Sequence, residues 1–155
     1  RGIYTLILGL SEKAYVAVGR LGVHRLDPGF YIYVGRGSGK GSSSVEGRLR
    51  RHLSKDKKSF WHVDHITLDT RFKAEAVVYA YTGELSECGL ARILAGELEA
   101  EYAVKGFGSS DCGCRGHLIH ASEASLQKLV ETIHRIFLKL KLKPEVFRVE
   151  AVKDR

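Results

Sequence analysis

Arg48 and His52 stand four residues apart in a segment whose apolar residues recur at helical spacing. The segment predicts a helix over about residues 44–53, capped by Ser43 or Ser44. Both side chains fall at the border of the apolar face, where packing can hold a side chain that still reaches a ligand. The alternative is an arginine that only extends from the edge of the core into solvent.

Glu87 is a second candidate for chemistry. It follows Ser86, a good helix cap, and a predicted helix over 86–98 places it on the same face as Leu90 and Leu94. A carboxylate on an apolar face is costly unless it has a charged partner or a metal ion. The alternative is an acid in the first turn that is favoured by the helix dipole.

The cysteines offer a second kind of metal site. Cys88, Cys112 and Cys114 with His117 or His120 have the ligand types of a Cys₃His zinc site. The Cys-x-Cys spacing is tighter than the usual zinc knuckle, and Cys88 is remote in sequence. Buried reduced thiols, or a disulfide of the kind found in hyperthermophiles, are the alternatives.

The composition favours a soluble domain with an anionic partner. The chain of 155 residues suits one domain, and its net charge of +7 favours nucleic acid through neutralisation of phosphates. The apolar runs are too short to span a bilayer and the first residues do not form a signal peptide, so we predict a cytoplasmic protein without a membrane partner. The chain has no Asn or Met and is rich in Lys, Arg and Glu, which favours a thermophilic source.

Alternation and helical spacing predict the remaining elements. Residues 14–26 form an inserted hairpin between the first strand and a strand that carries Tyr31 and Tyr33 on one face. The predicted strands are 3–8, 14–18, 23–26, 30–34, 60–68, 72–81 and 146–152, and the last predicted helix is 122–140.

Two further segments carry polar residues. The glycine-rich loop 35–44 does not have the spacing of a nucleotide-binding loop, so we predict a flexible basic loop that faces the substrate through Arg36 and Lys40. Arg50 and Arg51 point outward from their helix and are further candidates for nucleic-acid binding. In the strand predicted at 60–68, alternation separates His65 from His62 and Asp64, so a polar edge or a DNA-facing strand is favoured over a metal site.

The order of these residues resembles a known family. The tripeptides Gly2-Ile3-Tyr4 and Tyr33-Val34-Gly35, followed by Arg48, His52 and Glu87, are similar in order to the GIY-YIG nuclease superfamily. The segments 17–22, 60–65 and 106–112 resemble an archaeal family of uncharacterised proteins of this type. The resemblance covers residues 2 to about 90.

The resemblance implies an α+β fold, in which a small, mostly antiparallel sheet is flanked by helices. One domain then spans residues 1–155, with its core at about 2–105 and a helix-strand extension at about 106–155. Its implied activity is a metal-dependent endonuclease that nicks DNA or cuts DNA of a particular structure, in repair or recombination. RNA as a substrate, and a partner protein or fused domain that supplies specificity, are compatible with it.

The resemblance also implies a role for each site residue. Arg48 binds the phosphoryl oxygens, Glu87 holds Mg²⁺ or Mn²⁺, and Tyr4 deprotonates or orients the attacking water. Tyr33 and His52 position groups or relay protons. An inactive nucleic-acid-binding domain on the same fold is the first alternative, and an interaction module stabilised by zinc is the second.

Overall fold

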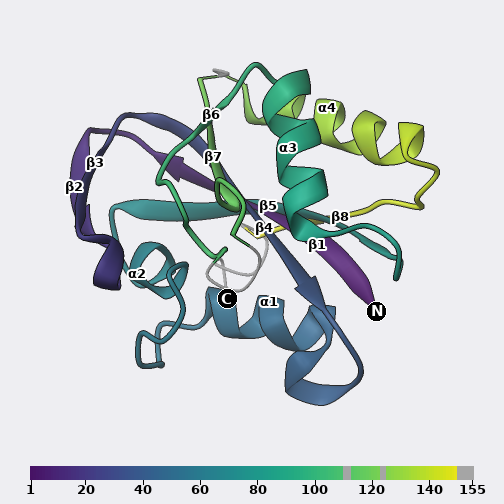
Figure 1. The fold of residues 1–155 in the computed structure, drawn as a ribbon, viewed down its shortest axis with the longest axis horizontal. Helices are drawn as coiled ribbons and strands as arrows, with labels where there is room; N and C mark the ends of the chain where they lie inside the picture. The colour runs from purple at the N-terminus through teal and green to yellow at the C-terminus, as the bar shows by residue number, and fades with distance from the viewer. Residues whose placement is uncertain (110–112, 123–124, 150–155) are drawn as a thin grey trace.

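An antiparallel sheet of six strands, in the order β6-β7-β4-β1-β5-β8, forms the centre of the protein (Figure 1). The computed structural model describes residues 1–109, 113–122 and 125–149. This architecture confirms the predicted α+β fold with a mostly antiparallel sheet. The strands are β1 (Gly2–Leu10), β4 (Gly29–Gly37), β5 (Phe72–Tyr81), β6 (Glu101–Tyr102), β7 (Leu118–Ala121) and β8 (Glu145–Arg148).

Helices cover both faces of the sheet (Figure 1). Alternation along β1 sends Tyr4, Leu6 and Leu8 into one apolar core and Ile3 and Ile7 into another. The first core is covered by α1 (Val45–Leu53), α2 (Asp64–Thr67) and the separate hairpin of β2 (Ala14–Ala17) and β3 (Val23–Leu26). The second is covered by α3 (Glu87–Glu97) and α4 (Leu126–Lys139). Two short 3₁₀ turns lie at Gly19–Leu21 and Gly41–Ser43.

Serine side chains begin the three longer helices. The hydroxyl oxygens of Ser44, Ser86 and Ser125 each accept a hydrogen bond from the backbone N–H three residues later. The first two helix starts are as predicted, and α4 begins later than residue 122. None of the helices in the described ranges is long and apolar enough to cross a membrane.

The strand predicted over 60–68 is wrong. The segment forms a turn followed by the one-turn helix α2, because the buried carboxylate of Asp64 accepts hydrogen bonds from the backbone N–H groups of Phe60 and Trp61, both at 2.8 Å. The short strands β6 and β7 were not predicted. The predicted closing strand is present as β8, and residues 150–152 of that prediction lie outside the described residues.

Candidate active site

Beside one end of β4, residues from elements on the two faces of the sheet come close to each other. β7 pairs with β4 only from Phe30 to Tyr33, and the N–H of Val34 then donates to the backbone oxygen of His117. Within the described ranges no strand pairs with this edge of β4 beyond Tyr33. The first turn of α3 can therefore reach past the sheet to the side of α1.

Three of the predicted site residues line one pocket of about 380 Å³. Tyr33 comes from the edge of β4, Arg48 from α1 and Glu87 from the first turn of α3. We call this the candidate pocket, and its other lining residues are Phe60, Trp61, His62 and Gly108. A guanidinium, a carboxylate and a phenol thus meet in one half-open space.

Arg48 is oriented by two neighbours. Its Nε donates to the backbone oxygen of Ser43 at 3.3 Å, and its guanidinium carbon lies 5.1 Å from the centroid of the Trp61 ring. No ion pair of Arg48 is present among the described residues. Its two terminal nitrogens are therefore available to an anionic ligand in the candidate pocket.

Tyr33 is nearly buried and keeps its proton. Its ring packs edge-on against His52 at 5.6 Å and Phe107 at 6.0 Å between centroids. Burial raises the pKa of Tyr33 far above its usual value, the charge of Glu87 raises it further, and Arg48 opposes the shift. The phenol is therefore a hydrogen-bond donor at neutral pH.

Tyr4 lies beneath the candidate pocket rather than in it. Its hydroxyl and Nε2 of His52 are 2.6 Å apart, and both residues are 1% exposed. Burial, with a smaller contribution from Tyr33, raises the pKa of Tyr4 well above its usual value. Burial and then the charge of Lys57 lower the pKa of His52 to about 3. A neutral tyrosine and a neutral histidine form this pair. That Tyr4 deprotonates or orients the attacking water stays a prediction, which the burial of its hydroxyl against His52 does not favour.

Gly35 makes room for Tyr4. The two residues are opposite each other in the β1–β4 register, and a Cβ at Gly35 would lie 2.3 Å from the Tyr4 hydroxyl oxygen. Real Cβ atoms do not approach so closely, so only a glycine at position 35 leaves room for the Tyr4 ring to pass over β4 and reach His52.

His62 is a pocket residue that the sequence reasoning missed. Its Nδ1 accepts a hydrogen bond from the backbone N–H of Gly108 at 2.8 Å. Burial, and then the neighbouring His65, lower the pKa of His62, so the ring is neutral and its proton is on Nε2. The wrong strand prediction hid this residue, because alternation cannot describe a turn.

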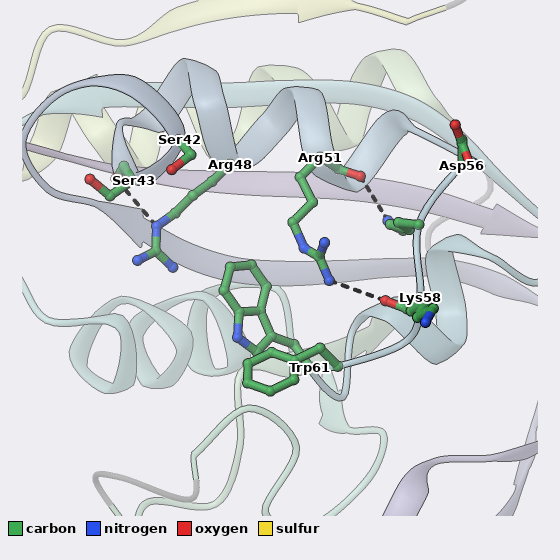
Figure 2. Close-up of a pocket in the computed structure, with 9 residues that line it drawn as sticks. Ser42, Ser43, Arg48, Arg51, Asp56, Lys58 and Trp61 are labelled. Atoms are coloured by element: carbon green, nitrogen blue, oxygen red, sulfur yellow. Dashed lines mark hydrogen bonds between the residues drawn. The ribbon is translucent and has the colours of Figure 1, made fainter.

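A second pocket of about 600 Å³ shares Arg48, Phe60 and Trp61 with the candidate pocket. Figure 2 shows Arg48 and Arg51 extending from α1 toward the indole ring of Trp61, and the Arg51 guanidinium carbon lies 5.0 Å from its centroid. We call this the basic pocket. Its remaining lining residues are Ser42, Ser43, Asp56, Lys57 and Lys58.

The helical pattern predicted that Arg51 points outward from α1, and this prediction is wrong. Its Nη2 lies 2.6 Å from Oδ2 of the buried Asp64, and Nζ of Lys57 lies 3.6 Å from Oδ1 of the same carboxylate. Lys57 also donates to the backbone oxygens of Arg51 and His52 at the end of α1, at 2.8 and 3.1 Å. The buried carboxylate of Asp64 therefore holds both the C-terminal end of α1 and the turn that carries Phe60 and Trp61.

The other three predicted nucleic-acid residues do not line the candidate pocket. Arg36 shares the face of Ile32 and Val34, which belong to the core on the opposite side of the sheet. Lys40 and Arg50 are exposed. Their placement leaves them on the outer surface of the loop and of α1.

Three of the residues expected to bind zinc lie together. Cys88, Cys114 and His117 have ligand atoms within 4.8 Å of one another, so the group could hold a metal ion, although the two cysteines form a disulfide. Nε2 of His117 is 3.3 Å from Sγ of Cys88. Cys112 lies outside the described residues. His120 is not part of the group, because its ring stacks on Tyr31 at 4.5 Å and its Nε2 lies 2.9 Å from the backbone oxygen of Pro28.

The comparisons with known proteins give a family but no function. The family model described as "Domain of unknown function DUF123" matches residues 3–139. It carries no GIY-YIG assignment, so the identification with the GIY-YIG nuclease superfamily and its archaeal members is wrong. No curated protein and no solved structure matches the chain.

Proposed function

The chain belongs to the DUF123 family of domains of unknown function, and we propose that it is a nuclease that hydrolyses phosphodiester bonds with a divalent metal ion. The observation that carries the proposal is the meeting of Tyr33, Arg48 and Glu87 in the candidate pocket. A positive guanidinium, a carboxylate and neutral hydrogen-bond donors are groups that can promote phosphodiester hydrolysis. The net charge of +7 supports an anionic polymer as substrate.

The four polar side chains of the candidate pocket each have a role in this proposal. The terminal nitrogens of Arg48 bind the phosphoryl oxygens, on which negative charge grows as water attacks. Glu87 would hold Mg²⁺ or Mn²⁺ through its carboxylate oxygens, and such an ion would supply positive charge that polarises the phosphate and lowers the pKa of water. Tyr33 and His62 donate hydrogen bonds that orient the phosphate or the water. Tyr33 is thus the tyrosine that reaches the substrate, and Tyr4 holds His52 beneath it.

Replacing Glu87 with glutamine is expected to slow metal-dependent cleavage by roughly 100-fold or more, since metal stabilisation of the transition state is worth several kcal/mol. Gln keeps the size of the side chain and removes the charge that holds the cation. Nicking of supercoiled plasmid, and cutting of single-stranded, duplex and branched DNA and of single-stranded RNA, are measured with Mg²⁺ and with Mn²⁺.

Glu97→Gln is the matched control, because Glu97 is exposed at the other end of the same helix. It should cleave at the wild-type rate. A Glu87→Gln protein as active as wild type would remove Glu87 as the metal ligand. Wild-type protein that leaves every DNA and RNA substrate intact with both metals would contradict the nuclease proposal.

A nucleic-acid-binding domain without cleavage is the second candidate function. It is favoured by the basic pocket, where Arg48 and Arg51 lie against the ring of Trp61 and Lys58 adds a further positive charge. The two functions are separated by offering the same substrates, because a binding domain forms a complex with the nucleic acid and does not cleave it.

Reduced protein is expected to bind about one zinc ion per chain through Cys88, Cys114 and His117, because two thiolates and an imidazole are preferred zinc ligands. A thiol reductant must first open the disulfide, since the ligand is the thiolate. Native mass spectrometry of reduced and oxidised protein measures the bound metal. Cys114→Ser should lose the zinc, and reduced wild-type protein without zinc would contradict the assignment.

A further inference from the structure

Phe60 is the most exposed of the large apolar side chains in the described residues, with 80% of its surface open to solvent. It lines both the candidate pocket and the basic pocket, so it lies on the wall between them. An aromatic ring in this position offers a large, accessible surface for contact with a ligand. Its place beside the proposed cleavage site points to a ligand that covers it.

The backbone that carries Phe60 is held firmly. The N–H groups of Phe60 and Trp61 both donate to the buried Oδ2 of Asp64, which also binds Arg51 at 2.6 Å. The Trp61 ring lies against the guanidinium groups of Arg48 and Arg51 (Figure 2) and 6.3 Å from the Phe60 ring. Phe60 is therefore an exposed ring on a fixed support, which limits the entropy lost when a ligand binds.

The basic pocket has the charge and size for nucleotides. Arg48 and Lys58 carry positive charge there without an ion pair among the described residues, and Ser42 and Ser43 add hydroxyl groups. Asp56 is the one acid among its lining residues. Its volume of about 600 Å³ is in the range of small-ligand sites. A sugar-phosphate backbone that leaves the candidate pocket past Phe60 enters this space.

We propose that Phe60 stacks on an unpaired base of the nucleic acid, while the basic pocket binds the phosphates that flank this base. The inference deepens the proposed function and rests on it for the nature of the ligand. A base inside a duplex has both faces covered by its neighbours, so away from a duplex end only an unpaired base can offer a face to Phe60. The substrate is therefore single-stranded, or has an unpaired nucleotide next to the cut.

Replacing Phe60 with alanine is expected to weaken binding of a single strand by roughly 5- to 150-fold, since stacking of one base on an aromatic ring is worth about 1–3 kcal/mol. Binding of a blunt duplex should change by less than about twofold, since that mode involves phosphates alone. Fluorescence anisotropy with labelled oligonucleotides of about 12 nucleotides measures both, as single-stranded DNA, single-stranded RNA and blunt duplex. The experiment is done in EDTA, so no cleavage occurs.

Two further variants test whether the loss of single-strand binding is caused by the loss of stacking. Tyr15→Ala removes an aromatic ring that is 58% exposed on the separate hairpin, and it should bind as wild type does. Phe60→Trp keeps an aromatic face and should restore binding. Trp61 is the single tryptophan of the chain, so its fluorescence gives a label-free readout of binding to wild type and to Phe60→Ala. Equal melting temperatures exclude unfolding as the cause.

Two results would overturn the inference. One is wild-type protein that binds the blunt duplex as tightly as the single strand, or binds neither. The other is Phe60→Ala protein that binds the single strand as wild type does, or loses duplex and single-strand binding equally. Because EDTA removes the metal, a protein that binds as expected yet never cuts retains this inference and loses the nuclease proposal. If the protein cleaves nucleic acid and Phe60→Ala binds the single strand as wild type does, only this inference is contradicted. The DNA and RNA measurements show which polymer is preferred.

Discussion

Replacing Arg48 with alanine is expected to lower the rate of metal-dependent cleavage by roughly 100- to 1,000-fold, the usual effect of removing one donor to transition-state charge. Arg48 is the one arginine that lines the candidate pocket, and its two terminal nitrogens have no ion-pair partner among the described residues. Single-turnover rates at saturating protein measure the chemical step separately from binding.

Replacing Arg48 with lysine tests the geometry of the same group. This substitution keeps the positive charge and loses the forked pair of donors, so Arg48→Lys should recover only part of the rate. Arg135→Ala, an exposed arginine of α4, is the control for net charge and should cleave normally. If Arg48→Ala weakens binding but cleaves at the wild-type single-turnover rate, Arg48 is a binding residue and takes no part in the transition state.

Hydrophobic periodicity predicted the type of those elements that bury one face, such as α1, or both faces, such as β1. β1 is apolar on both faces because a core lies on each side of it, and the spacing of Val45, Leu49 and Leu53 marked the apolar face of α1. The segment at 60–68 failed for a local reason. Asp64 binds the backbone of its own turn, and such bonds compete with a strand without changing the apolar pattern.

The candidate pocket was only partly predictable. Glu87 was marked by a carboxylate on an apolar helix face, and Arg48 by its place at the edge of another. Glu87 and Arg48 meet because β7 begins only at Leu118, opposite Tyr33, and β7 is too short to stand out in the sequence. Tyr4 and Tyr33 share a face of the sheet, so alternation could not tell which is buried beneath and which reaches the pocket.

Replacing Asp64 with alanine is expected to lower the free energy of unfolding by about 3–5 kcal/mol, the usual cost of removing one partner of a buried ion pair. Asp64 is fully buried, and its loss leaves the nearly buried Lys57 without its partner carboxylate. Two backbone N–H groups lose their acceptor as well. Urea unfolding followed by circular dichroism measures the change. Asp69→Ala is the control, since its partner Arg71 is half exposed and such a surface pair is worth about 1 kcal/mol or less.

The pH dependence of stability separates the charge of Asp64 from its packing. Burial alone would raise the pKa of Asp64, but the N–H groups of Trp61 and Phe60, Arg51 and Lys57 together lower it. A carboxyl whose pKa is lower in the folded protein stabilises fully above its unfolded value, near pH 4, and this stabilisation is lost as the pH falls through the folded pKa. The stability difference between wild type and Asp64→Ala should therefore shrink as the pH falls below about 4. A difference that stays constant into strong acid would show that Asp64 acts by packing, and that its charge does not hold the turn that carries Phe60 and Trp61.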